Sequence, residues 1–173
     1  AIGAQVANTA IELGMNVIGY DPFLSVDAAW SLNHEVKHAE TLDTLFAKSD
    51  YITVHVPETP DTKGLINANT IKNMKDGVRI INIARGGLVN NEDVLAAINS
   101  GKIAALVTDF AAEELLGNDK VICMPHLGAS TPEAEENCAV MAVKELRDFL
   151  EAGNIEHSVN FPKCKLDSVI PAG

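Results

Sequence analysis

The sequence predicts an α/β fold built on a doubly wound parallel sheet. Short apolar segments of strand length alternate with segments of helical periodicity along nearly the whole chain, which is typical of repeated βαβ units. The apolar residues are mostly Ala, Val, Ile and Leu, and aromatic residues make up only 5%. This mixture suits helices packed on a buried parallel sheet. The 173 residues fit one domain, because domains commonly hold about 100–200 residues.

The expected strands are short apolar runs, and they cover residues 16–20, 50–56, 78–84, 103–108 and 120–124. The expected helices carry apolar residues at helical spacing and cover residues 4–13, 41–48, 69–74, 92–99 and 132–151. Gly14 and Gly101 each follow a helix as an end signal. Either Asn90 or Asn91 is the expected N-cap of helix 92–99.

The chain begins on a helix, whereas a doubly wound domain begins on a strand. We therefore expect at least one strand and most of a phosphate-binding loop to precede this sequence, so that the sheet is incomplete at its N-terminus. Residues 1–152 are predicted to form the nucleotide-binding domain. Residues 153–173 have no clear period and are interpreted as an exit segment toward a substrate or regulatory domain.

Charge and cysteine content exclude several classes of function. The net charge is −11, and the chain has no Lys/Arg cluster, which argues against nucleic acid or an anionic membrane as a partner. The three cysteines, Cys123, Cys138 and Cys164, are widely spaced and include no C-x-x-C motif. We expect no disulfide framework, no metal and a reducing compartment, the cytoplasm. No apolar run approaches the ~20 residues of a membrane span.

Candidate functional residues follow the predicted strands. In open α/β sheets ligands bind outside the carboxyl ends of the strands. We therefore expect the residues at those ends to line one edge of the sheet. They are Asp21, Val56 with Pro57, Arg85 with Gly86 and Gly87, Asp109, and His126.

Asp21 follows Gly3 at close to the spacing of about 20 residues that separates fingerprint glycines from a ribose-binding carboxylate. A carboxylate at this position favours NAD, because it would repel the 2′-phosphate of NADP. Asp21 also precedes Pro22, and an Asp-Pro turn is the alternative interpretation.

Arg85 precedes a glycine pair, and its guanidinium could bind a carboxylate through two hydrogen bonds. His126 could exchange a proton near neutral pH. Asp109 could accept a hydrogen bond from a carboxamide. The alternatives are a surface arginine, a structural histidine and a turn cap. A carboxylate beside His126 would favour catalysis, and Glu113 and Glu114 are the candidates.

Four segments then resemble the D-2-hydroxyacid dehydrogenase family. They are GMNVIGYDP (14–22), DYITVHVPETPDTKGLIN (50–67), GVRIINIARGGLVN (77–90) and PHLGAST (125–131). The resemblance covers about residues 1–160 and implies a Rossmann-like domain that binds NAD. It implies that Arg85 binds the substrate carboxylate and carbonyl, that His126 is the acid/base and that Glu114 pairs with His126. The lack of a Glu-Pro after the strand leaves Glu113 as an alternative to Glu114.

The resemblance also implies a set of cofactor contacts. They are Ala1, Ile2, Gly3, Asp21, Val56, Ile83, Ala84, Arg85, Asp109, His126, Leu127, Gly128 and Ala129. In this set Ala1, Ile2 and Gly3 end the phosphate-binding loop, and Asp109 accepts from the nicotinamide carboxamide. Glu58 stands where relatives often have an apolar residue, and the sequence offers no physical reason for it.

PHLGAST together with SVNFP (158–162) is most similar to family members that oxidise D-3-phosphoglycerate to 3-phosphohydroxypyruvate with NAD, the first step of L-serine biosynthesis. The expected partner is therefore a small phosphorylated 2-hydroxy acid, and we expect a homo-oligomer. The alternatives are a glyoxylate/hydroxypyruvate or D-lactate reductase of the same family and an NAD-sensing, corepressor-like binding protein. The 173-residue chain by itself is expected to be inactive.

Overall fold

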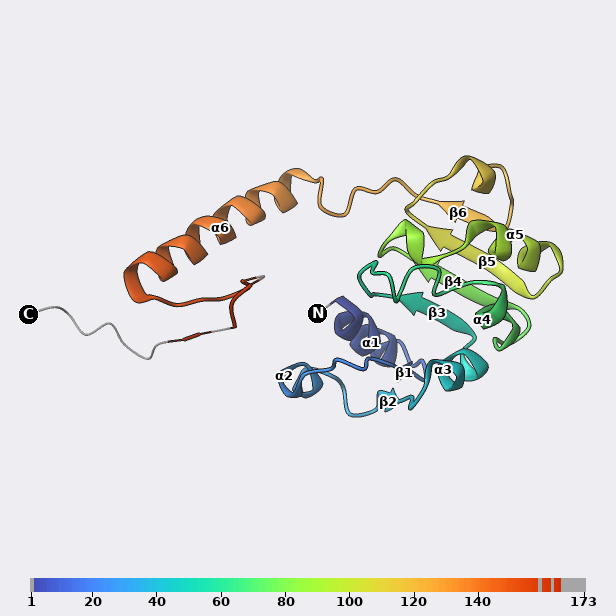
Figure 1. Ribbon diagram of the computed structural model, residues 1–173, viewed down its shortest axis with the longest axis horizontal. Helices are drawn as coiled ribbons and strands as arrows, with labels where there is room; N and C mark the ends of the chain where they lie inside the picture. The colour runs from blue at the N-terminus through green and yellow to red at the C-terminus, as the bar shows by residue number, and fades with distance from the viewer. Residues whose placement is uncertain (1, 159, 163, 166–173) are drawn as a thin grey trace, which may run out of the picture. The chain divides into compact units, whose positions relative to one another are not determined.

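The computed structural model describes residues 2–158, 160–162 and 164–165. The chain divides into two compact units, residues 1–126 and residues 127–173, and each is described by itself. Two residues singled out in the sequence, Ala1 and Val159, lie outside the described residues. The first unit holds the parallel sheet and the second holds one long helix (Figure 1).

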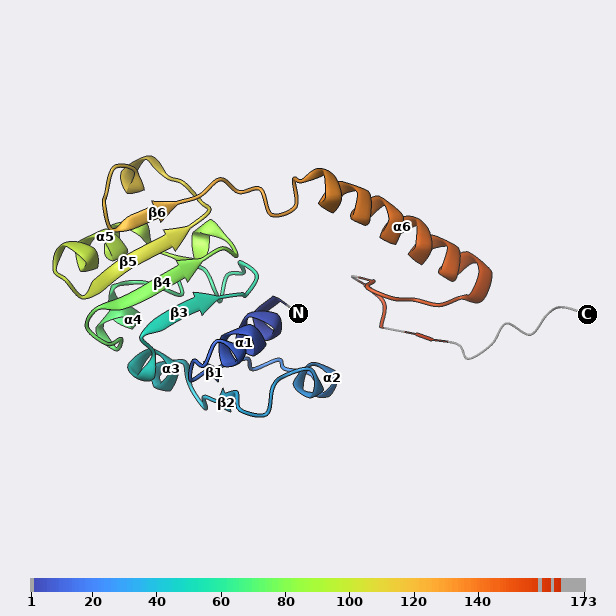
Figure 2. The ribbon, with the colours of Figure 1, turned by 180° about the vertical axis from the view of Figure 1, so that it is seen from behind.

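A four-stranded parallel sheet forms the centre of the first unit. Its strands are β3 (Tyr51–Val54), β4 (Val78–Asn82), β5 (Ile103–Thr108) and β6 (Val121–Cys123), and they lie in the order β3-β4-β5-β6. All three neighbouring pairs are parallel, and the four arrows point the same way in Figures 1 and 2. The residues that follow these strands therefore share one side of the sheet, called here the carboxyl edge.

Side-chain capping starts the three helices that precede β3, β4 and β5 in the chain. Thr41 caps α3 (Leu42–Lys48), Asn67 caps α4 (Ala68–Lys72) within a reciprocal capping box, and Asn90 caps α5 (Asn91–Asn99). Each of these side chains accepts a backbone N–H that the first turn of a helix leaves without a partner. Asn90, rather than Asn91, is thus the N-cap that the sequence left undecided.

The core lies on one face of the four-stranded sheet. Buried residues alternate with exposed ones along β3 and β4, as expected for a strand that is covered on one face. Ile80, Leu106 and Val94 of α5 belong to the same buried cluster. On the other face the Arg79 guanidinium lies 5.2 Å from the centre of the half-exposed Tyr51 ring.

The N-terminal region forms a second, smaller sheet. Helix α1 (Ile2–Glu12) precedes β1 (Ile18–Gly19). Strand β1 pairs in parallel with β2 (Lys37–His38), and the short helix α2 (Val26–Trp30) lies in the connection between the two strands. Within the described residues the two sheets share no ladder, so the expected single edge holds for the strands β3 to β6 and does not include β1. Strand β2 and helix α2 were not predicted, because such short elements carry too few residues to show a period.

Helix α6 (Pro132–Ala152) makes up most of the second unit and matches the predicted range within one residue. Thr131 caps its start, and Gly153 ends it in the left-handed conformation with φ of 68°, which glycine adopts without steric cost. Beyond the helix, Ile155 and Cys164 form an isolated antiparallel bridge. No helix in the described part of the chain combines the length and apolar character needed to cross a membrane.

Candidate active site

Asp109 and His126 are in contact at the carboxyl edge. His126 Nδ1 lies 2.9 Å from Asp109 Oδ2, and the Asp109 side chain is 8% exposed whereas that of His126 is 55% exposed. Asp109 follows β5 and His126 lies three residues beyond β6. The carboxylate therefore orients the imidazole ring and engages Nδ1, while the ring itself remains open to solvent. This is the arrangement of a histidine whose second nitrogen, Nε2, exchanges a proton.

Arg85 sits on a turn that buried polar groups hold in place. The Asn82 side chain, only 2% exposed, donates from Nδ2 to the Arg85 carbonyl at 2.9 Å and accepts from the Ala84 N–H at 3.2 Å. Arg85 then leads into a short 3-10 helix, η1 (Gly86–Leu88). Its own guanidinium is exposed and donates to the Ala84 carbonyl at 2.6 Å. The backbone is thus ordered while the charged group remains available to an anion.

Phe110 connects the Arg85 turn with His126. Its ring centre lies 4.8 Å from that of His126, with the planes tilted by 44°. On the other side, a Cβ placed on Gly86 would lie 3.4 Å from the Phe110 ring, so the turn packs directly against this ring. Arg85 and His126 consequently belong to one continuous patch at the carboxyl edge. Phe110 thus places Gly86, the neighbour of Arg85, and His126 at the same edge, and the joint role of Arg85 and His126 stays a prediction.

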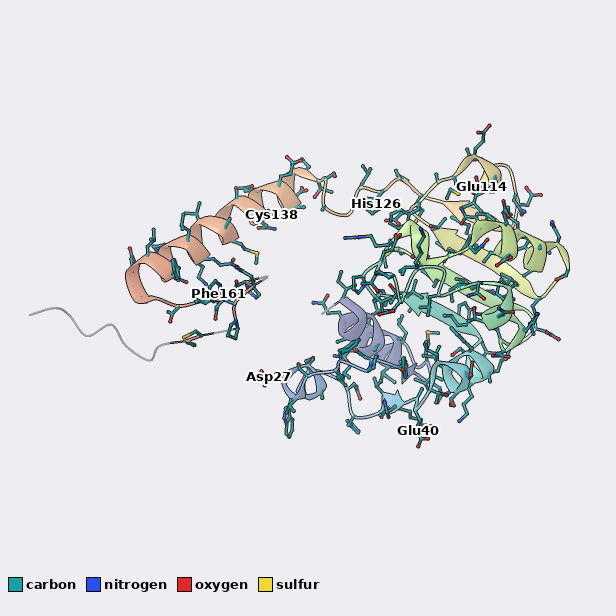
Figure 3. All side chains as sticks on the ribbon, viewed as in Figure 1. Asp27, Glu40, Glu114, His126, Cys138 and Phe161 are labelled. Carbon is teal, nitrogen blue, oxygen red and sulfur yellow. The ribbon has the colours of Figure 1, made fainter. Side chains whose placement is uncertain are left out.

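Glu114 lies elsewhere. It belongs to the short 3-10 helix η2 (Glu113–Leu115) in the connection between β5 and β6. Its Oε1 accepts from the Asn91 side-chain amide at 2.9 Å, and this hydrogen bond lowers the pKa of the exposed Glu114 carboxyl. Figure 3 shows Glu114 on the loop and His126 beyond the end of the sheet. The expected contact between Glu114 and His126 is therefore corrected, because Asp109 is nearer to the ring and fills that place. Glu113, the alternative, is exposed on the same helix.

The N-terminus of α1 lies against the end of β3. A Cβ on Gly3 would lie 3.4 Å from the Cβ of His55, so Gly3 occupies the side of the sheet where the sequence places the phosphate-binding loop. Burial lowers the pKa of His55, whose Nε2 lies 2.9 Å from Thr53 Oγ1. Ile2, next to Gly3, is exposed. Helix N-termini favour anions because their N–H groups lack partners.

The other predicted cofactor contacts lie partly in the first unit and partly in the second. Asp21 follows β1, is exposed, and accepts the Phe23 N–H through Oδ1 at 2.9 Å, which is the Asp-Pro turn that the sequence left as an alternative. Val56 follows β3 and is partly buried. After β4, Ile83 is exposed and Ala84 is partly buried. The remaining three residues begin the second unit, and they are Leu127, Gly128 and Ala129.

Two buried polar residues escaped the sequence analysis, although each holds part of the site. Asn82 orders the Arg85 turn, and Thr108, which is 3% exposed, accepts the Phe110 N–H through Oγ1 at 3.1 Å. Each is the last residue of its strand, and its neighbours on the buried face of that strand are apolar. A lone polar residue at the end of a buried strand was the available signal, since a buried polar group needs a partner. Both residues line a small cavity of about 170 Å³ beneath the turns.

Comparison with known proteins places the chain in a family. Residues 1–128 match the family described as D-isomer specific 2-hydroxyacid dehydrogenase, NAD binding domain. With its parallel sheet and a charged edge, the chain is a dinucleotide-binding α/β domain, and it belongs to this family. The cofactor of the domain is therefore NAD, as predicted.

Its curated relatives include proteins named D-3-phosphoglycerate dehydrogenase. The one from Synechocystis is 41% identical over 167 residues, which are 93% of this chain and 30% of the relative. The one from Homo sapiens is 37% identical over 165 residues, which are 92% of this chain and again 30% of the relative. The chain thus spans about a third of the length of these relatives.

Solved structures of the same family share the fold. A glyoxylate reductase from Paecilomyes thermophila superposes with a TM-score of 0.78 at 29% identity, over 92% of this chain and 49% of that one. A D-lactate dehydrogenase from Aquifex aeolicus, complexed with NAD and lactic acid, has a TM-score of 0.71 at 31% identity, over 86% of this chain and 50% of that one.

One atom at the carboxyl edge fits the nicotinamide end of NAD. Asp109 Oδ1 is a buried oxygen without a hydrogen-bond partner within the described residues, and such an atom is costly unless a donor reaches it. A carboxamide N–H would satisfy this oxygen, as the sequence resemblance implied for Asp109. The unpaired acceptor at this edge therefore agrees with the cofactor of the family.

Proposed function

We propose that this chain supplies the NAD-binding half of an enzyme that oxidises D-3-phosphoglycerate to 3-phosphohydroxypyruvate, the first step of L-serine biosynthesis. The observation that carries the proposal is the Asp109–His126 pair, which Phe110 joins to the Arg85 turn. Relatives named D-3-phosphoglycerate dehydrogenase at up to 41% identity support this choice of substrate.

In this proposal each side chain has a stated task. Arg85 binds the substrate carboxylate and the reacting oxygen, because its fork of N–H groups matches a carboxylate and polarises a carbonyl in the reverse direction. His126 accepts the hydroxyl proton at Nε2, while Asp109 holds the ring through Nδ1 and stabilises its charged form. When bound, NAD supplies the nicotinamide that accepts the hydride.

The same proposal includes the cofactor contacts. The first three residues of the sequence, Ala1, Ile2 and Gly3, would approach the pyrophosphate, and Asp21 would accept from the adenosine ribose. The nicotinamide end would be flanked by Val56, Ile83, Ala84, Asp109 and the segment from His126 to Ala129. Asp109 takes the place beside His126 that the resemblance implied for Glu114, which binds Asn91 instead.

A panel of 2-oxo acids tests the choice of substrate. We expect the protein that carries this domain together with a substrate-binding domain to reduce 3-phosphohydroxypyruvate with a kcat/KM well above those for glyoxylate, hydroxypyruvate and pyruvate. If glyoxylate or pyruvate were reduced equally well, the enzyme would instead be a glyoxylate/hydroxypyruvate or D-lactate reductase. The absence of NAD-dependent turnover with every acid in the panel would reject the enzymatic proposal itself.

The 173-residue chain alone should show no turnover, because an active site between two domains cannot close when one of them is missing. Residues 1–152 would act as the NAD-binding domain and residues 153–173 as the exit segment. We further propose a homo-oligomer in the cytoplasm. Three unpaired cysteines support a reducing compartment, and light scattering on the purified protein would measure the oligomeric state.

A further inference from the structure

Glu58, the residue that the sequence left without a physical reason, reaches the Arg85 turn. It lies in the loop that follows β3, and its Oε2 accepts the Gly87 N–H at 3.2 Å. Gly87 lies in η1, two residues after Arg85. Glu58 therefore links the exits of two neighbouring strands, β3 and β4, directly beside the candidate substrate-binding arginine.

The contact between Glu58 and Gly87 is close because Gly87 has no side chain. A Cβ on Gly87 would overlap the carboxylate of Glu58, so a larger residue would displace the Glu58 side chain. The same residue is also held through its carbonyl, because the Gly64 N–H donates to the Gly87 carbonyl at 2.8 Å. The loop that carries Glu58 is itself ordered, since Thr62 Oγ1 donates to the Pro57 carbonyl at 2.6 Å.

Arg85 thus stands between two anchors of the backbone. On the strand side, Asn82 binds both the Ala84 N–H and the Arg85 carbonyl. On the helix side, Glu58 binds the Gly87 N–H. The carboxylate accepts an N–H from the first turn of η1, which has no side-chain cap of its own at Arg85. A charged acceptor makes a stronger hydrogen bond to such a group than a neutral one does.

We propose that Glu58 is a positioning residue, which holds the turn at Gly87 so that Arg85 presents its guanidinium to the substrate carboxylate. The inference rests on the proposed role of Arg85. Glu58 acts through the backbone and makes no contact with substrate in this proposal. An apolar residue at the same position could not accept the Gly87 N–H, so the turn would lose the hydrogen bond that Glu58 supplies.

Two substitutions in the full-length protein test the role of Glu58. We expect Glu58→Ala to raise the KM for the 2-hydroxy acid by about tenfold, the cost of one charge-assisted hydrogen bond, and to leave the KM for NAD close to wild type. Glu58→Gln should restore most of the lost affinity, because its amide oxygen still accepts the Gly87 N–H. Glu40→Ala removes an exposed carboxylate far from the site (Figure 3) and should change neither constant. Equal KM values for Glu58→Ala and wild type would overturn the proposal.

Hydrogen exchange separates this inference from the proposed function. In Glu58→Ala the Gly87 amide should exchange faster than in wild type, whether or not the protein turns over any substrate. Gly87→Ala should be destabilising in wild type and less so in Glu58→Ala, because the second variant removes the overlapping carboxylate. If the Gly87 amide exchanged at the wild-type rate in Glu58→Ala, the hydrogen bond from Gly87 to Glu58 would be rejected. If that amide exchanged faster but the wild-type protein showed no dehydrogenase activity, only the role of Arg85 would be rejected.

Discussion

His126 Nδ1 lies 2.9 Å from Asp109 Oδ2, and this pair defines the candidate active site more directly than any sequence motif. The two residues follow neighbouring parallel strands, β5 and β6, so the sheet itself brings them together. The family resemblance implied Glu114 for the same place, but Glu114 binds Asn91 instead. The competing assignments can be separated with single substitutions.

Asp109→Asn should lower kcat by about 100-fold or more, within the range that general acid–base catalysis contributes. The asparagine amide keeps the shape of the carboxylate, but it cannot stabilise the charged imidazole. Glu114→Gln should leave kcat close to wild type, because Glu114 contacts Asn91 rather than His126. The measurement is steady-state kinetics at several pH values at saturating NAD. The opposite order of effects would assign the histidine partner to Glu114.

Arg85→Lys should raise the KM for the 2-hydroxy acid by about tenfold or more, although the positive charge is kept. An ammonium group cannot reproduce the two parallel hydrogen bonds of a guanidinium. The folded structure should tolerate this change, since the side chain is exposed and the turn is held by Asn82. Steady-state kinetics measure the KM, and a thermal melt shows whether the variant is as stable as wild type. An unchanged KM would remove Arg85 from the substrate site.

Asp21→Asn should weaken the preference for NAD over NADP by about tenfold. The asparagine oxygen can still accept the Phe23 N–H that Asp21 Oδ1 accepts, so the turn is preserved while the charge that repels a 2′-phosphate is lost. Dissociation constants for both dinucleotides, measured by calorimetry, test this expectation. If the ratio of the two constants stays the same, Asp21 serves only the turn.

Stability should fall in mild acid because of His55. Burial holds the pKa of His55 below its ordinary value of 6.5, so the unfolded chain binds more protons than the folded one between these two pKa values. Stability therefore rises with pH through this window and is lost as pH falls through the folded pKa. Urea unfolding at pH 7.5 and 5.5 should show a larger loss for wild type than for His55→Gln. His34→Gln, at an exposed site, is the control and should keep the wild-type loss.

The sequence predicted most of the helices and strands because these elements are long enough to show a pattern. The strand at residues 103–108 was placed to the residue, and the helix at 132–151 was within one residue of α6. Strand β1 lies within the predicted strand 16–20, whereas the two residues of β2 are too few to show a period. The parallel pairing of β1 with β2 depends on contacts between segments far apart in the chain.

By itself the sequence determined the fold class and the strand ends where charged residues gather, because apolar periodicity and the position of turns are local properties of the chain. The cofactor followed from the resemblance of its segments to a family. Only the tertiary structure decided which side chains meet. Asp109 rather than Glu114 contacts His126, and Glu58 reaches Gly87 across 29 residues. The register of neighbouring strands and the path of each loop settle such contacts, and neither can be read from residue spacing alone.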